Sequence, residues 1–117
     1  MRRNAEKKYA NSHRDWIVYQ KSKTLAQEIF EMTKSFPKEE TYSLTDQVRR
    51  SSRSVGAQIA KAWAKRAYEN HFISKLTDSD GEQHETQHRI ETAEDPGFFR
   101  LKNLNSWFKN VAKSEDC

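Results

Sequence analysis

The segment that most suggests chemistry is His84-Glu85-Thr86-Gln87-His88, which matches the H-E-x-x-H pattern. Histidines four positions apart lie on one face of a helix, where they can bind Zn²⁺ while the glutamate acts as a general base. A catalytic zinc also needs a third protein ligand in a sheltered cleft, but the flanking residues are polar and no histidine occurs downstream. We therefore expect no cofactor and no catalytic metal. At most, His84 and His88 bind a divalent ion at the surface.

A second pair, Arg66 and His71, has the arginine-x4-histidine spacing found in helical ribonucleases of the HEPN class. In such an enzyme the histidine handles the proton of a ribose 2′-hydroxyl and the arginine stabilises phosphate charge. The same spacing suits a structural arginine and a partly exposed histidine at a helix junction. Our first interpretation is a protein without enzymatic activity, and a metal-independent ribonuclease using Arg66 and His71 stays open as an alternative.

Positive charge is concentrated in residues 44–68, where six basic residues are opposed by one acidic residue, Asp46. Cations on one helix can neutralise phosphates and release counterions, which makes affinity fall as salt rises. The alternative is a solvated face, or one that pairs with the acidic stretch 69–96 in the same bundle or in another subunit. The candidate nucleic-acid-binding residues are Arg49, Arg50, Arg53, Lys61, Lys65 and Arg66.

The elements that carry these residues are predicted to be helices. Only 34% of the 117 residues are apolar, with 3 Gly and 2 Pro, which disfavours a large α/β core and a many-stranded β fold. Apolar residues recur at steps of three, four and seven and indicate helices over residues 13–35, 44–66, 70–93 and 98–111. Four helices with short connections predict an all-α, antiparallel up-down-up-down four-helix bundle.

Local signals place the breaks between these helices. Pro37 ends the first helix because a proline forces the preceding residue out of helical backbone angles. Ser43 and Asp46 resemble a capping box at the start of the second helix. Gly56, inside that helix, predicts close approach of a neighbouring helix, and Asp95-Pro96-Gly97 predicts a turn.

The same sequence features predict the domain organisation. Residues 1–12 are expected to be a flexible basic arm, residues 13–113 a single bundle domain, and residues 114–117 a tail. Cys117 is the only cysteine, which excludes an intramolecular disulfide and favours a cytoplasmic protein. No stretch is apolar enough for a signal peptide or a membrane span, so we expect no membrane partner.

Several motifs in residues 14–93 resemble a known family. They are Phe36-Pro37 through Glu40, Tyr42 and Leu44 to Gln47, then Arg49-Arg50-Ser51, Ser54-Val55, Ile59-Ala60, and the later Phe72, Leu76, Glu82, Glu85 and Thr86. In this order they resemble the four-helix-bundle proteins encoded by intervening sequences of bacterial 23S rRNA genes. The resemblance implies an up-down bundle, commonly a ring of five, related to the accessory variability protein of diversity-generating retroelements, which binds nucleic acid and a reverse transcriptase. Two positions depart from the family: Lys61 replaces a usual glutamate, and Arg89 a usual aromatic.

These observations predict a non-enzymatic interaction protein that binds nucleic acid, above all structured RNA or a nucleoprotein partner, through its basic second helix. It is expected to form a homo-oligomer, and a reverse transcriptase is a possible protein partner by resemblance. A purely structural homo-oligomer or protein-partner adaptor is the alternative. Trp63 and Tyr68 are expected to be packing aromatics rather than platforms for stacked bases.

Overall fold

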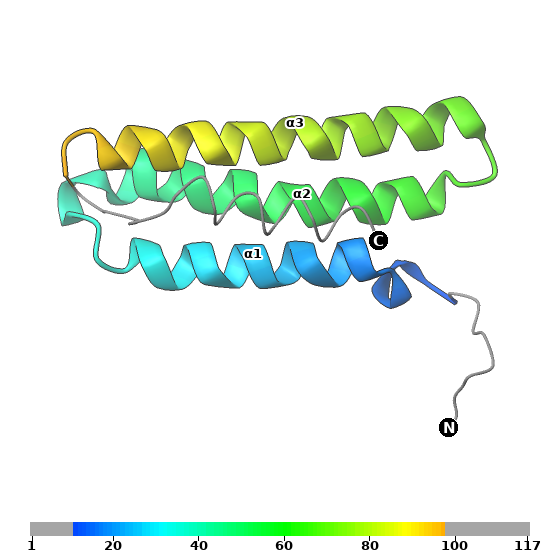
Figure 1. Cartoon of the computed structure of the whole chain (residues 1–117), viewed down its shortest axis with the longest axis horizontal. Helices are drawn as coiled ribbons and strands as arrows, with labels where there is room; N and C mark the ends of the chain where they lie inside the picture. Colours follow the sequence, from blue (N-terminus) through cyan, green and yellow to red (C-terminus); the bar gives the residue numbers. More distant parts are fainter. Residues whose placement is uncertain (1–10, 98–117) are drawn as a thin grey trace, which may run out of the picture.

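The computed structural model describes residues 11–97, and these residues are entirely helical, with no strand among them (Figure 1). The three long helices are α1 (Ile17–Thr33), α2 (Asp46–Ala64) and α3 (Glu69–Glu94), and they run up, down and up. Short helical turns precede α1 and join it to α2. The predicted all-α class is confirmed.

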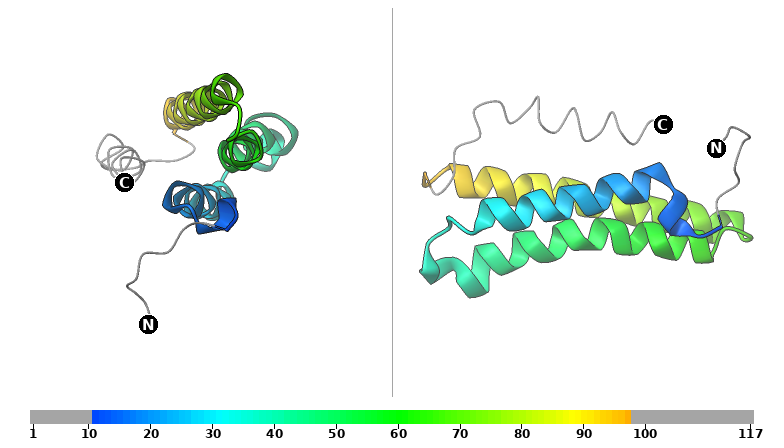
Figure 2. Two further views of the ribbon diagram at one scale, coloured as in Figure 1. Left: turned by 90° about the vertical axis from the view of Figure 1, so that its right-hand side faces the viewer. Right: turned by 90° about the horizontal axis from the view of Figure 1, so that it is seen from below.

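Helix α2 occupies the central position. It packs closely against both α1 and α3, whereas α1 and α3 make much less contact with each other. Seen along the bundle, α2 lies to one side of the other two helices and touches both (Figure 2). Two separate strips of its surface are therefore used for packing.

The core is formed by the apolar stripes that the spacing predicts. Leu25 and Ile29 from α1 meet Val48, Val55 and Ile59 from α2, and all five are at most 2% exposed. Burial of each such side chain contributes about 1.5–3 kcal/mol of hydrophobic free energy. The remaining buried apolar members of this cluster are Phe36, Leu44, Ile90 and Ala93.

The first predicted helix is interrupted near its start. A short 3-10 helix, η1 (His13–Asp15), begins where the Ser12 hydroxyl accepts a hydrogen bond from the Arg14 backbone N–H. Trp16 is then extended, with φ −75° and ψ 131°, and α1 starts only at Ile17. The Trp16 ring lies edge to face against Trp63, with the ring centroids 4.9 Å apart. This extended residue brings the indole to the other helix.

The connection between α1 and α2 is more helical than predicted, and the predicted capping box is wrong. A 3-10 helix, η2 (Lys38–Glu40), follows Pro37 and leads into a π-helical turn, η3 (Thr41–Thr45), that continues into α2. Ser43 lies inside that turn and donates its hydroxyl to the Glu40 carboxylate at 2.6 Å. The same carboxylate oxygen of Glu40 accepts from the Leu44 N–H, so Glu40 is the capping residue.

Helix α3 is joined to the other helices by polar contacts as much as by apolar ones. The predicted break after α2 is confirmed, and residues 65–68 form the turn. Ser79, Gln83 and Thr86 are buried in the middle of α3. The Ser79 hydroxyl donates to the Val55 carbonyl at 2.9 Å, and the Thr86 hydroxyl lies 2.9 Å from that of Ser51. Hydrogen bonds thus replace part of the missing apolar surface.

Gly56 allows α1 and α2 to approach closely, as predicted. A Cβ atom on Gly56 would lie 2.8 Å from the Ser22 Oγ atom and 3.6 Å from the Tyr19 ring. The predicted turn at Asp95-Pro96-Gly97 is also present, with Gly97 at φ +84°, in the left-handed region that favours glycine.

Some predictions lie outside the described residues. They concern the arm from residue 1 to 10 with Arg2, Arg3, Lys7 and Lys8, the fourth helix with Phe98, Leu101, Leu104, Phe108 and Val111, and the tail with Cys117. The fourth helix of the bundle therefore stays a prediction. Within residues 11–97, no helix is long and apolar enough to cross a membrane.

The two helical glycines provide a test of this packing. Gly56→Val should lower the free energy of unfolding by about 1–3 kcal/mol, because its side chain overlaps Ser22. Gly81→Val is the matched control, since nothing lies within 4 Å of its Cβ position, and it should change stability by less than about 1 kcal/mol. Urea unfolding followed by circular dichroism measures both. Equal effects of the two substitutions would contradict the close approach at Gly56.

Candidate nucleic-acid interface

The outward face of α2 carries most of the predicted basic residues. Arg50, Arg53, Lys61, Lys65 and Arg66 are exposed, whereas Arg49 is half-buried. Ala57 and Ala64 are exposed on the same helix, so short side chains separate the long cationic ones. On this face, long cationic side chains stand out above the short alanine side chains between them.

Arg49 is used to hold two helices together. Its Nε donates a hydrogen bond of 2.7 Å to the Thr33 hydroxyl of α1, and its guanidinium lies 4.5 Å from the centre of the Phe30 ring. Thr33 is only 2% exposed. A charged hydrogen bond to a buried hydroxyl and a cation–π contact both favour the packed position. Arg49 is therefore a structural contact between α1 and α2.

Arg66 is turned back onto the end of α2. Its Nη1 donates to the Trp63 carbonyl at 2.8 Å, and its guanidinium lies 3.9 Å from the Trp63 ring centre. A cation placed at the last carbonyls of a helix is favourable for the helix dipole. His71 is exposed on the first turn of α3 and meets Tyr68 rather than Arg66. The side chains of Arg66 and His71, which a ribonuclease would use together, thus contact different neighbours.

Three cations on α2 and in the turn that follows it have no acidic partner. No ion pair within residues 11–97 involves Arg53, Lys61 or Lys65. Arg50 makes one exposed contact of 3.9 Å with Asp46, and such pairs contribute at most about 1 kcal/mol. The ion pairs of the described residues all join positions three or four apart, so none neutralises α2 with α3.

A groove runs between α1 and α2 beside these cations. It has a volume of about 530 Å³, and its floor includes the small residues Gly56, Ala57 and Ala60. Lys23 of α1 and Arg53 of α2 are among the residues that line it. The groove therefore extends the positive surface of α2 towards α1.

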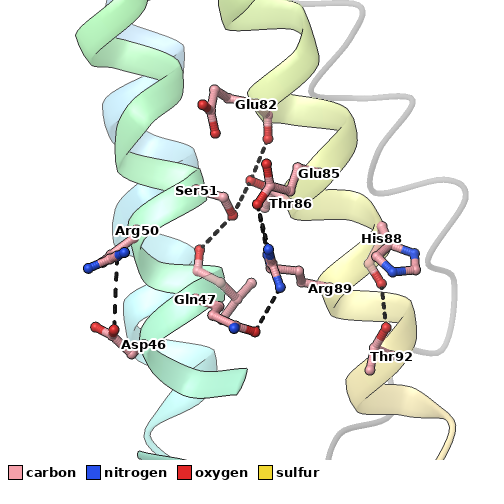
Figure 3. Close-up of polar contacts among 11 residues, drawn as sticks. Asp46, Gln47, Arg50, Ser51, Glu82, Glu85, Thr86, His88, Arg89 and Thr92 are labelled. Atoms are coloured by element: carbon pink, nitrogen blue, oxygen red, sulfur yellow. Dashed lines mark hydrogen bonds and ion pairs between the residues drawn. The ribbon is translucent and has the colours of Figure 1, made fainter. Parts of the chain in front are cut away.

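The other side of α2 meets a polar cluster on α3 (Figure 3). Arg89 donates from Nη2 to the Glu85 carboxylate at 2.6 Å and from Nη1 to the Gln47 side-chain oxygen at 2.7 Å. Arg89, which the resemblance marks as a departure from an expected aromatic residue, thus bridges α3 to α2.

Glu82, in the same cluster, has an unusual environment. Partial burial raises the pKa of its carboxyl above the ordinary value, and the negative charges of Glu85 and Asp78 raise it further, while Arg89 lowers it. Ionised Glu82 therefore costs the folded state free energy. The ionised carboxylate of Glu82 also places negative charge on α3, beside the basic face of α2.

The H-E-x-x-H segment lies along α3 with its residues facing different surroundings. Glu85 is engaged by Arg89, whereas His84 and His88 are exposed, and His88 points away from α2 in Figure 3. The His84 Nδ1 atom lies 2.9 Å from the Asp80 carbonyl oxygen. In the described part of the chain, no group of three or more His, Cys, Asp or Glu residues is placed to hold a metal ion.

Comparison with known families assigns the chain. Residues 14–115 match the family described as 23S rRNA-intervening sequence protein, and this match covers most of the 117 residues. The chain belongs to the 23S rRNA-intervening sequence protein family. The match extends beyond residue 93, where the resemblance was expected to end. No curated protein matches the sequence significantly.

In this member of the 23S rRNA-intervening sequence protein family, the sequence contains a signal that Arg49 faces α1. Arg49 and Gly56 are seven positions apart and lie on the same helix face. Because Gly56 was predicted to face a neighbouring helix, Arg49 could have been expected to face it too. Lys23 and the partner residues Phe30 and Thr33 were missed, because periodicity does not tell which two helices are adjacent.

The structural role of Arg49 can be tested against its neighbour. Arg49→Ala should lower the free energy of unfolding by about 1–3 kcal/mol, because it leaves the buried Thr33 hydroxyl without this partner and removes the cation from Phe30. Arg50→Ala should change stability by no more than about 0.5 kcal/mol. Chemical denaturation measures the stability of both variants. An Arg49→Ala variant as stable as Arg50→Ala would refute the structural role of Arg49.

The raised pKa of Glu82 predicts how the stability of the fold depends on pH. The folded-state pKa of Glu82 is raised, so stability is lost as pH rises through the interval between the unfolded and the folded pKa. Glu82→Gln, which cannot ionise, should raise the melting temperature at pH 7, and the gain should shrink as pH falls towards the ordinary value of 4.5. Glu91→Gln, at an exposed position of α3, is the control. A gain that is constant with pH would contradict the assignment.

Proposed function

We propose that this protein binds nucleic acid, in the form of structured RNA, through the outward face of α2, and that it acts without catalysis. The observation that carries the proposal is a line of exposed cations without ion-pair partners, Arg53 and Lys61 on α2 and Lys65 in the turn that follows it. Cations without carboxylate partners are free to replace counterions along a phosphate backbone. Arg50 joins them at the cost of one exposed ion pair.

The shape of the face supports a phosphate backbone as the ligand. Arg50 and Lys65 are fifteen positions apart, which corresponds to about 22 Å of helix, enough to follow several phosphates. Ala57 and Ala64 let the backbone approach the helix closely. Lys23, which lines the α1–α2 groove together with Arg53, supplies a further cation beside this line.

The charge of α3 supports an orientation for the ligand. Asp78, Glu82 and Glu85 lie on or beside the α3 surface that meets α2. Their negative charge repels a polyanion. The nucleic acid in this proposal therefore lies over α2 towards α1.

Family membership is compatible with this role but states no activity. The family is named for sequences within 23S rRNA genes. The resemblance to a nucleic-acid-binding accessory protein supports RNA as the ligand and makes a reverse transcriptase a candidate protein partner. A homo-oligomer, with five subunits by the same resemblance, would multiply one modest patch into a stronger binding surface.

A structural homo-oligomer is the second candidate function. It is favoured by the opposite charges of α2 and α3, which form no ion pair with each other in the described residues. Such faces could meet between copies. In that case the unpaired cations of α2 would be buried by a second subunit and would not bind RNA.

The direct test is charge reversal on α2. Arg53→Glu with Lys61→Glu should weaken binding of a structured RNA at least tenfold at low salt and reduce the slope of log K against log salt by about 1.4–1.8. The helical circular dichroism should persist, because these exposed side chains make no hydrogen bond or ion pair, and the contact of the Arg53 guanidinium with the Phe30 ring is long, at 5.9 Å. Fluorescence anisotropy at two salt concentrations measures the affinity.

The matched control reverses two exposed lysines elsewhere, Lys21→Glu with Lys38→Glu. This control changes the net charge by the same amount but should retain most of the affinity. An equal loss in both variants would mean that net charge alone attracts the RNA. Absence of RNA binding by the wild-type protein would shift the assignment to the structural oligomer.

A further inference from the structure

Tyr68 is a large aromatic residue that the fold leaves uncovered. It is 64% exposed, although it was predicted to pack. It ends the short turn, residues 65–68, that leads from the basic face of α2 into α3. The prediction was wrong because the turn reverses the chain before α3 begins, so the Tyr68 ring lies beyond the interface of the two helices.

The backbone on either side holds Tyr68 in place. Its N–H donates to the Lys65 carbonyl at 2.8 Å, and its own carbonyl accepts from the Phe72 N–H at 2.9 Å. The ring makes one described aromatic contact, with His71, at 6.2 Å between centroids and an interplanar angle of 84°. This is an edge contact rather than a stack, so the ring is positioned but not covered.

The other aromatic rings at this end of the bundle are already occupied. Trp16 contacts Trp63 at 4.9 Å and Phe72 at 6.1 Å, and the guanidinium of Arg66 covers Trp63 at 3.9 Å. Tyr68, in contrast to these described rings, has a large free surface. Lys65 lies in the same turn, and Lys61 lies one helical turn earlier on α2.

We propose that Tyr68 is a stacking platform for an unpaired base at the end of the basic face. The inference rests on the proposed function, because the cations of α2 must first bring the backbone to this point. Every base has a face that can stack on an exposed aromatic ring, whereas paired bases within a helix are already stacked on their neighbours. The preferred ligand is then an RNA helix that carries unpaired nucleotides, rather than a fully paired one.

The test compares two RNAs that differ only in unpaired bases. A blunt RNA duplex and the same duplex with a single-stranded extension of about four to six nucleotides are titrated by fluorescence anisotropy. The wild-type protein should bind the extended RNA at least fivefold more tightly. Tyr68→Ala should lose this preference and keep its affinity for the blunt duplex, with an unchanged salt dependence. Tyr68→Phe, which retains the ring, should behave as the wild type.

Tyr42 provides a matched control. It is 94% exposed and precedes α2, whereas Tyr68 follows it, so the two tyrosines lie at opposite ends of the bundle (Figure 1). Tyr42→Ala should bind both RNAs as the wild type does. An equal loss in the Tyr42 and Tyr68 variants would overturn the assignment to Tyr68.

The failures of the two proposals give different results. Equal binding of both RNAs by the wild type, weakened by Arg53→Glu with Lys61→Glu, would overturn the role of Tyr68 alone. It would leave Tyr68 as a surface for a protein partner. Absence of binding to either RNA at low salt would overturn the proposed function and the stacking role together.

Discussion

The fold depends on the close packing of α2 against two neighbours at once. On one side a Cβ atom at Gly56 would lie 2.8 Å from the Ser22 Oγ atom of α1. On the other side, Ser51 and Val55 contact α3 through hydrogen bonds with Thr86 and Ser79. These two strips leave one face of α2 without a described packing partner. Long side chains are accommodated on that face, and there the chain places its unpaired cations.

The polar seam of α3 has consequences for charge as well as for stability. Buried Ser79, Gln83 and Thr86 supply little hydrophobic free energy, so contacts such as the Arg89 bridge to Gln47 help to join α3 to α2. The acidic residues around that bridge create a negative flank beside the positive face of α2. The polar seam that compensates for a thin core is thus flanked by acidic residues, and these divide the surface into regions of opposite charge.

The sequence predicts the helices better than the contacts between them. The buried positions of α1, α2 and α3 follow the apolar spacing because burial repeats with the helical period. Glu40 as the capping residue and Arg49 as an interhelical tie were missed, because both depend on which groups approach in three dimensions. Tyr68 was predicted to be a packing aromatic from its residue type, and the turn that exposes it is set by the geometry of residues 65–68.

The central claim is that the outward face of α2 binds RNA while its other faces hold the fold. Lysine acetylation footprinting read by mass spectrometry, with and without a structured RNA, tests this claim residue by residue. The account predicts slower acetylation of Lys61 and Lys65 in the presence of RNA and no change at Lys38, which is exposed in the α1–α2 connection. Protection of Lys38 to the same degree, or no protection of Lys61 and Lys65 under conditions where RNA is bound, would contradict it.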